Sequence, residues 1–151
     1  MTKDVLDAMG ICHLDRDGYE ADDIIGTVAK MASENGVQSY LLTGDRDYFQ
    51  LVDENTTVLF TKKGITEVEK VDVAWIQKTY DLLPCDLIEV KGLQGDTSDN
   101  IPGVAGIGEK TALKLIRTYG TIENVYAHIE ELKGKMRQNL EEGETQAYLS
   151  R

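Results

Sequence analysis

The sequence has little cysteine, histidine and proline, with 2 residues of each among 151. Cys12 and Cys85 are far apart and lack the CxxC spacing or clustered histidines of a zinc site. Two isolated cysteines also do not suggest the disulfide framework of a small secreted domain. We therefore expect two buried, reduced thiols, and neither a zinc centre nor a disulfide-stabilised fold.

Long hydrophobic runs are also absent. No segment approaches the roughly 18 consecutive apolar residues of a membrane span, and residues 1–10 contain no apolar signal-peptide core. The chain is 41% hydrophobic and 28% charged, as soluble globular proteins are, and its 151 residues suit one ordinary domain. We expect a cytoplasmic protein with no membrane partner.

Basic residues are fewer than acidic ones, at 16 against 27, and the net charge of −11 argues at first against a nucleic-acid partner, because lysine and arginine drive phosphate binding. Their distribution is uneven, however. Residues 1–100 hold 9 basic and 20 acidic side chains, whereas residues 101–138 hold 6 basic and 4 acidic ones. A basic segment therefore follows an acidic one. Acidic solubility with a locally neutral helix pair accounts for the same charges equally well.

Periodicity divides the chain into two parts. Helical patterns alternate with strand-like runs up to Gly95, which predicts an α/β fold with a parallel-type sheet and flanking helices over residues 1–95. Only helical patterns follow, over residues 96–151. The expected helices are residues 2–10, 18–36, 71–83, 84–93, 109–120, 121–132 and 135–151. The expected strands are residues 11–14, a buried strand at 37–45, and a hairpin of 56–60 with 65–69 around a Lys63-Gly64 turn.

Acidic residues gather in three clusters at the ends of these elements. The clusters are Glu20, Asp22 and Asp23; Asp45 and Asp47; and Asp96 and Asp99. Two carboxylates at about 4 Å repel by roughly 1 kcal/mol even in water, so seven converging acids require cations. Oxygen-only ligands favour Mg²⁺ or Mn²⁺ over zinc. Two such ions suit phosphodiester hydrolysis, which makes the seven acids catalytic and metal-binding candidates.

Each cluster also has a structural interpretation. Acids in a first helical turn complement the helix dipole. Moreover, Glu20 and Asp23 share a helix face whereas Asp22 lies about 200° from Glu20, so at most two of these three can ligate one ion. Asp45 lies at the carboxyl end of an expected strand, where α/β sheets bind ligands, but a plain Asx turn is the alternative there. Convergence of the clusters is therefore the hypothesis to examine.

A glycine-rich segment, NIPGVAGIGEKTALKL, follows the third cluster directly. Its glycines permit a tight turn with outward backbone amides, and the helix that begins next has a positive end that favours anions. The spacing is not that of a nucleotide P-loop. We expect contact with a phosphate backbone, although a closely packed helix connector is the alternative. The DNA-binding candidates are Gly103, Gly106, Gly108, Lys110, Thr111, Lys114 and Arg117.

Three segments together resemble the 5′-nuclease domain of bacterial DNA polymerase I, which is related to flap endonucleases and phage 5′-exonucleases. They are GYEADDIIGTVA, LLTGDRDYFQLV and LQGDTSDNIPGVAGIGEKTA, in the order found in that family. The resemblance covers nearly the whole chain. It implies a PIN-like 5′-nuclease core followed by a helix-hairpin-helix region. The activity it implies is that of a metal-dependent 5′-3′ exonuclease and flap endonuclease in DNA replication and repair.

The resemblance also assigns roles. It implies that the three acidic clusters hold two Mg²⁺ or Mn²⁺ ions, some ligands acting directly and others through water. Gly103 to Thr111 resembles the hairpin that grips duplex DNA and often holds K⁺ on backbone carbonyls. The implied partners are DNA with a 5′ flap or a nick, RNA primers, and a polymerase domain in the full-length protein. A nucleoid-associated location follows from these partners.

One departure from the family pattern affects the activity. Family members begin with a strand that carries another catalytic Asp, followed by a second Asp and a basic helical arch. This sequence starts after those features, so it looks like the last two-thirds of the domain. Weak activity is therefore one expectation. The alternative is a non-catalytic module that binds duplex DNA.

Overall fold

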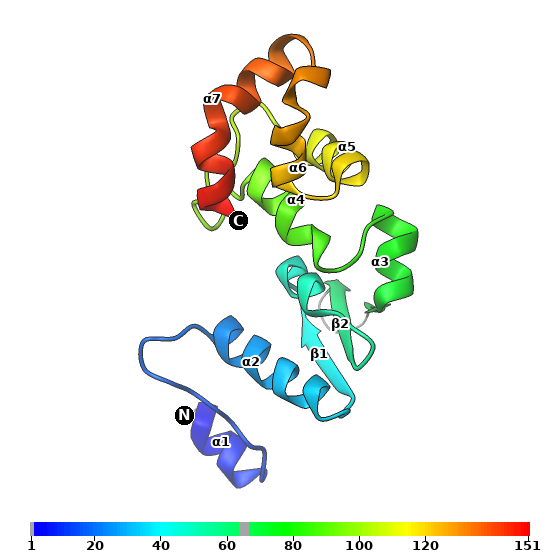
Figure 1. The fold of residues 1–151 in the computed structure, drawn as a ribbon. Helices are drawn as coiled ribbons and strands as arrows, with labels where there is room; N and C mark the ends of the chain where they lie inside the picture. Colours follow the sequence, from blue (N-terminus) through cyan, green and yellow to red (C-terminus); the bar gives the residue numbers. More distant parts are fainter. Residues whose placement is uncertain (1, 64–66) are drawn as a thin grey trace.

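The computed structural model describes residues 2–63 and 67–151. Figure 1 shows α1 and α2 at one end of the molecule, the sheet in the middle, and the helices from α5 to α7 at the other end. The elements in chain order are α1 (Thr2–Ala8), α2 (Ala21–Glu34), β1 (Ser39–Thr43), the 3-10 helix η1 (Arg46–Leu51), β2 (Thr56–Lys63), β3 (Glu67–Val71), α3 (Val73–Tyr80), α4 (Asp86–Gln94), α5 (Glu109–Tyr119), α6 (Ile122–Ala127), the 3-10 helix η2 (Ile129–Glu131) and α7 (Gly134–Ser150).

The sheet has three strands in the order β1-β2-β3. β1 and β2 are parallel, with Ser39 opposite Thr56, whereas β2 and β3 are antiparallel. The parallel pair and the hairpin both match the expectation from sequence. The expected turn at Lys63-Gly64 lies partly outside the described residues. The sheet is therefore mixed, and η1 follows directly in the chain after the end of β1.

Local signals explain where several helices begin and end. The Asp72 carboxylate accepts a hydrogen bond from the Trp75 amide at 3.0 Å and caps α3, and the Thr121 hydroxyl accepts one from the Asn124 amide at 3.2 Å and caps α6. Gly120 ends α5 with φ of 85°, a conformation that favours glycine. These caps were predictable because each depends on neighbouring residues alone.

Three expectations about local structure are wrong. Residues 11–14 form no strand, because the Ile11 amide bonds back to the Leu6 carbonyl at 2.9 Å and closes the end of α1. The strand β1 is only half buried, since it lies at the sheet edge with Tyr40 and Leu42 exposed. The two cysteines are free, as expected, but exposed, because both lie in connecting segments rather than in a core.

The molecule has two hydrophobic cores. One lies in the α/β part and centres on Phe49, Val58 and Ile76. The other lies among the helices and includes Leu93 and Leu140. Tyr80 and Leu87 pack against both cores and connect them. Among the described residues, no helix has both the length and the apolar character needed to cross a membrane.

Candidate metal centre and nucleic-acid interface

Three of the predicted acidic residues meet between the two cores. Asp47 lies in η1, and Asp96 and Asp99 lie in the loop after α4. Each offers a carboxylate oxygen, and these oxygens lie within 4.8 Å of one another. Their side chains are 35%, 24% and 52% exposed, so solvent reaches all of them. A set of three partly exposed carboxylates is the kind of hard oxygen donor that Mg²⁺ or Mn²⁺ prefers, so these residues fit such an ion.

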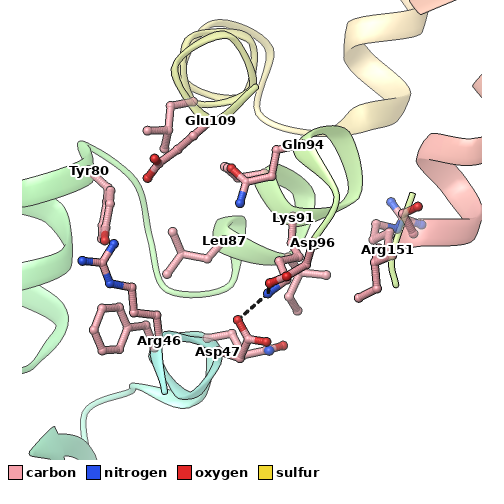
Figure 2. A pocket seen from close by; sticks show the side chains of 16 residues that line it. Arg46, Asp47, Tyr80, Leu87, Lys91, Gln94, Asp96, Glu109 and Arg151 are labelled. Carbon is pink, nitrogen blue, oxygen red and sulfur yellow. Dashed lines mark hydrogen bonds and ion pairs between the residues drawn. The ribbon is translucent and has the colours of Figure 1, made fainter. Parts of the chain in front are cut away.

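A lysine lies among these acids. The Lys91 ammonium, from the last turn of α4, is 2.5 Å from carboxylate oxygens of both Asp47 and Asp96, and 3.9 Å from Asp99. Figure 2 shows Lys91 and Asp47 facing each other across the gap between α4 and η1. This lysine therefore joins two segments that are far apart in the sequence.

The contacts shift the pKa values of Lys91 and Asp96. Burial acts to lower the pKa of Lys91, but the hydrogen bonds to Asp47 and Asp96 outweigh it and raise that pKa above its usual value. The hydrogen bond from Lys91, followed by those from Ser98, holds the pKa of Asp96 far below its usual range. Asp96 is therefore ionised, and Lys91 charged, at neutral pH.

The loop that carries Asp96 and Asp99 has a fixed shape. The Asp96 and Ile101 backbones exchange two hydrogen bonds, of 2.8 and 2.7 Å, and close the loop as an isolated antiparallel bridge. The Asp96 carboxylate also accepts a hydrogen bond from the Ser98 amide at 2.8 Å. Gly95 has φ of 71°, and a Cβ there would lie 2.6 Å from the Ile101 carbonyl oxygen. The local sequence thus holds one oxygen of Asp96 and leaves the other for Lys91.

Two cavities adjoin Asp47. A cavity of about 360 Å³ lies between the two parts of the chain and is lined by Asp47, Lys91 and Asp96 among others, as seen in Figure 2. A second, of about 380 Å³, is lined by Asp47 together with Asp22 and Asp23 of α2. Asp47 therefore connects the first predicted acidic cluster with the third.

Asp22 is held by a tyrosine. The buried Tyr48 hydroxyl donates a short hydrogen bond to the Asp22 carboxylate. Burial, with a smaller contribution from this bond, raises the pKa of Tyr48 to about 12. The hydroxyl therefore stays protonated and remains a donor at neutral pH, which fixes one oxygen of Asp22 on the side of α2 that faces η1.

Glu20 and Asp45 are not part of the group of close carboxylates formed by Asp47, Asp96 and Asp99, although all seven acids were expected to converge. Glu20 precedes α2 in an extended conformation, and its amide donates to Asp23 at 3.0 Å in a reciprocal capping box. Glu20 is the N-cap and not part of the helix, but it does lie beside Asp23 as expected, whereas Asp22 faces Tyr48. Asp45 accepts a hydrogen bond from the Asp47 amide at 2.9 Å and caps η1. Glu20 and Asp45 are not among the residues that line these two cavities, and the hydrogen bonds described for them are those of local caps.

The predicted hairpin packs closely against the loop and α7. Gly103 has φ of 56°, and a Cβ there would lie 2.2 Å from the Gly95 nitrogen. The Gly103 amide donates a hydrogen bond to the Ser150 hydroxyl at 3.0 Å. Gly106 has φ of 79°, and a Cβ there would meet the Asn139 amide nitrogen at 2.3 Å. Gly108, by contrast, has open space around it. Two of the three predicted glycines are therefore required by the fold itself.

The basic candidates lie on α5. Lys110, Lys114 and Arg117 are exposed, and their spacing puts them on one face of the helix. Arg117 also donates from Nε to the Tyr80 carbonyl at 2.6 Å, so it ties α5 to α3. The Thr111 amide bonds to the Gly108 carbonyl at 2.9 Å in the first turn. Lys110 and Lys114 therefore remain the more available cations of this set.

Sequence reasoning missed Lys91 and Tyr48. Lys91 carried a weak signal, because a lysine in the last turn of a helix, five residues before Asp96, can reach an acid in the following loop. Tyr48 carried none, since its partner Asp22 is 26 residues away. Both contacts are tertiary, and neither follows from periodicity or spacing.

Each of the two parts of the chain matches the model of a known protein family. The family described as 5′-3′ exonuclease, N-terminal resolvase-like domain, matches residues 1–81, and the family described as 5′-3′ exonuclease, C-terminal SAM fold, matches residues 82–151. DNA polymerase I of Bacillus caldotenax is 46% identical over 152 residues, which cover 100% of this chain and 17% of that protein. The thermostable DNA polymerase I of Thermus thermophilus is 39% identical, with 100% and 18% covered. The chain therefore spans less than a fifth of the length of these relatives.

Solved structures give the same fold. The T5 5′-exonuclease, in a structure with bound divalent metal ions (zinc), is 25% identical with a TM-score of 0.79, over 97% of this chain and 54% of that one. The catalytic core of Rad2 in complex with DNA substrate is 22% identical with a TM-score of 0.63, over 95% and 48%, and shows the fold alone. The family matches together cover the described residues of both cores, and the chain belongs to the 5′-3′ exonuclease family.

Proposed function

We propose that this chain carries part of the catalytic centre of a metal-dependent 5′-3′ exonuclease and flap endonuclease that acts on DNA in replication and repair. The observation that carries the proposal is the meeting of Asp47, Asp96 and Asp99 within 4.8 Å, beside a cavity between the two parts of the chain. Mg²⁺ or Mn²⁺, bound as one or two ions, would supply a hydroxide nucleophile and stabilise the leaving oxygen.

The residues of the chain have separate tasks in this proposal. Asp47, Asp96 and Asp99 are the metal ligands that the geometry favours, with Asp22 and Asp23 across the second cavity from Asp47. Tyr48 orients Asp22, and the closed loop after α4 orients Asp96. Glu20 and Asp45 remain predicted members of the site that act from the capping positions described above. The fixed side chains reduce the ordering needed when a phosphodiester arrives.

The hairpin and α5 form the proposed DNA grip. The backbone of Gly103 to Thr111, with Lys110 and Lys114 on the exposed face of α5, is suited to contact with a phosphate backbone, which carries no sequence information directly. Carbonyls of this hairpin are the proposed place for K⁺. The proposed division by function is a metal-site part over residues 1–95 and a DNA-binding part over residues 96–151, although Asp96 and Asp99 at the start of the second part also belong to the proposed metal site. The hydrophobic cores divide elsewhere, since α4 contributes Val90 and Leu93 to the helical core.

The proposed partners follow from the same family. They are DNA with a 5′ flap or a nick, RNA primers, and a polymerase domain in the whole protein, which would act in the bacterial cytoplasm at the nucleoid. The relatives named DNA polymerase I support DNA and a polymerase domain as partners, and the T5 5′-exonuclease with bound divalent metal ions supports a nuclease role; the RNA primers and the nucleoid are implied by the family resemblance alone.

The second candidate is a module that binds duplex DNA without cleaving it. It is favoured by one observation, that the Lys91 ammonium already neutralises part of the acidic centre. In this case the hairpin would still contact phosphates, and the acids would have a structural role.

A cleavage assay tests the proposal. The chain is incubated with a fluorescent 5′-flap duplex and Mn²⁺, beside an Asp47→Asn, Asp96→Asn double variant. We expect the double variant to lose at least about 100-fold in cleavage rate, because both changes remove ligand charge. A Glu34→Gln, Glu54→Gln variant is the matched control, since it removes two exposed acidic charges outside the centre. Cleavage that persists in the double variant would rule out the nuclease centre.

A binding assay tests the DNA grip separately. Replacing Lys110 and Lys114 with alanine should weaken duplex binding for all sequences alike and reduce the log–log salt slope by about 2. Fluorescence anisotropy at several salt concentrations measures both quantities. Binding that depends on Lys110 and Lys114, without any cleavage by the unaltered chain, would favour the second candidate. A loss confined to particular sequences would contradict the phosphate contact.

A further inference from the structure

Lys91 occupies the place that a bound cation would take. Its ammonium lies 2.5 Å from both Asp47 and Asp96 and 3.9 Å from Asp99, and these are the same three residues whose oxygens are close enough to hold a metal ion. Its side chain is only 20% exposed. The amine is therefore built into the acidic centre rather than lying over it.

The charges at this centre do not balance. Three carboxylates face one ammonium, which leaves an excess of negative charge that still attracts a cation. A divalent ion on the same oxygens would lie within a few ångströms of the ammonium, and like charges at such distances repel strongly in a partly desolvated site. Lys91 and a divalent ion are therefore competitors for these oxygens.

The Lys91 side chain can also move away from the carboxylates. Its four-carbon side chain is flexible, and its ammonium is strongly hydrated, so the amine can move out into the adjoining cavity of about 360 Å³ and toward solvent. Asp47 and Asp96, in contrast, are held by η1 and by the closed loop. Exchange therefore requires the movement of one side chain and leaves the backbone in place.

We propose that Lys91 is a tethered counter-ion of the acidic centre, which holds Asp47 and Asp96 together in the free protein and is displaced when a divalent ion binds. The inference rests on the proposed metal-dependent function. It makes Lys91 a positioning residue that lowers metal affinity, so that ion binding has a threshold, while it prevents the unscreened acids from pushing α4 and η1 apart.

The test is Mn²⁺ binding, followed by the electron paramagnetic resonance signal of free Mn²⁺. Lys91→Met keeps the length of the apolar stem without the charge, and we expect it to bind Mn²⁺ about tenfold more tightly than the unaltered chain. Lys91→Arg keeps the charge and should bind Mn²⁺ within about threefold of the unaltered chain. Equal or weaker binding by Lys91→Met would overturn the proposal.

A second readout covers the free protein. In EDTA, Lys91→Met should unfold at a lower temperature than the unaltered chain, and saturating Mn²⁺ should raise its melting temperature by the larger amount, since ligand binding stabilises the folded state. Lys62→Met is the matched control, because Lys62 forms a 2.6 Å ion pair with Glu69 on the sheet, away from the acidic centre. A change in Lys62→Met equal to that in Lys91→Met would also overturn the proposal.

The experiment separates this inference from the proposed function. The Asp47→Asn, Asp96→Asn variant defines the background of Mn²⁺ binding. Should the unaltered chain bind Mn²⁺ above that background with no gain in Lys91→Met, the counter-ion role is wrong and the metal centre stands. Should neither protein exceed the background, both the role and the metal centre fail.

Discussion

The helical part of the molecule is better packed than the α/β part. Among residues 2–63 and 67–151, the helical core contains thirteen buried residues, whereas the α/β core contains six. Of the large apolar side chains that are exposed among the described residues, eleven belong to residues 2–81 and three to residues 82–151. The helical part therefore has the core it needs, and the α/β part presents apolar surface on α2 and β1, where such surfaces ordinarily mark contacts with other protein.

The difference matters for the proposed centre, because its ligands come from both parts. Asp96 and Asp99 lie on a loop fixed by the well-packed helices, whereas Asp47 lies on η1 in the less packed part. Lys91 bridges them. The geometry of the centre should consequently be set by the helical part and be sensitive to anything that loosens η1.

The largest effect should come from the junction in the helical part. Gly103→Ala would put a Cβ 2.2 Å from the Gly95 nitrogen at a positive φ of 56°, so we expect a loss of at least about 3 kcal/mol in the free energy of unfolding. Urea denaturation followed by circular dichroism measures it. Gly108→Ala is the control, since its Cβ would meet nothing within 4 Å, and it should cost about 1 kcal/mol through the helix cap. Equal losses in the two variants would show that the packing at Gly103 is not limiting.

The next effect tests whether the two cores unfold separately. Trp75 is the only tryptophan and packs against Phe49, with ring centroids 5.6 Å apart, so its fluorescence reports on the α/β core. Ile76→Ala should lower the stability seen by fluorescence by about 3 kcal/mol, because it leaves a cavity in that core. Leu140→Ala should lower the stability seen by circular dichroism by a similar amount, and change the fluorescence midpoint little.

Coupling through the residues that pack against both cores would make the two cores unfold together. Tyr80 and Leu87 pack against both cores, and the Lys91 bridge adds a further link. If these contacts dominate, both probes would move together in both variants, and the molecule would unfold in one transition. The less packed α/β core would then be stabilised by its neighbour, contrary to the expectation of two transitions.

Local chemistry made much of the fold predictable from sequence. Asp72 and Thr121 cap helices and Gly120 ends one through contacts within one helical turn, so the ordinary capping preferences of Asp, Thr and Gly account for them. Residues 11–14 could not be judged in this way, because a strand needs a partner and a short apolar run gives no information about one. The exposure of Tyr40 and Leu42 was hidden for the same reason, since burial depends on what covers each face of the sheet.

The candidate site was predictable in kind and only partly in detail. Acids at the ends of β1 and α4 indicated an oxygen-ligand centre, and Asp47, Asp96 and Asp99 do meet. Spacing could not show that Asp45 would cap η1, because an Asx turn and a ligand use the same side chain. The Lys91 contact with Asp47 spans 44 residues, so it exists only once the two parts have packed together.

The smallest effect concerns a polar contact that holds α2 to the sheet, where apolar burial is limited. The Asp53 carboxylate accepts hydrogen bonds from the Ser33 hydroxyl at 2.7 Å and from the Asn55 and Thr56 amides at 2.8 and 2.7 Å. Burial acts to raise the pKa of Asp53, but these bonds outweigh it and lower that pKa.

A lowered folded-state pKa of Asp53 means that its carboxylate stabilises the fold above the unfolded-state pKa near 4. This stabilisation is lost as the pH falls through the folded-state value. Asp53→Asn should therefore cost about 1 kcal/mol at pH 6, a modest amount because water screens the exposed side chain, and progressively less below pH 4. Urea denaturation from pH 2.5 to 7 measures the gap, with Glu54→Gln as the adjacent exposed control. A gap that stays constant across this range would mean that the shape of the turn, and not the charge of Asp53, holds α2 in place.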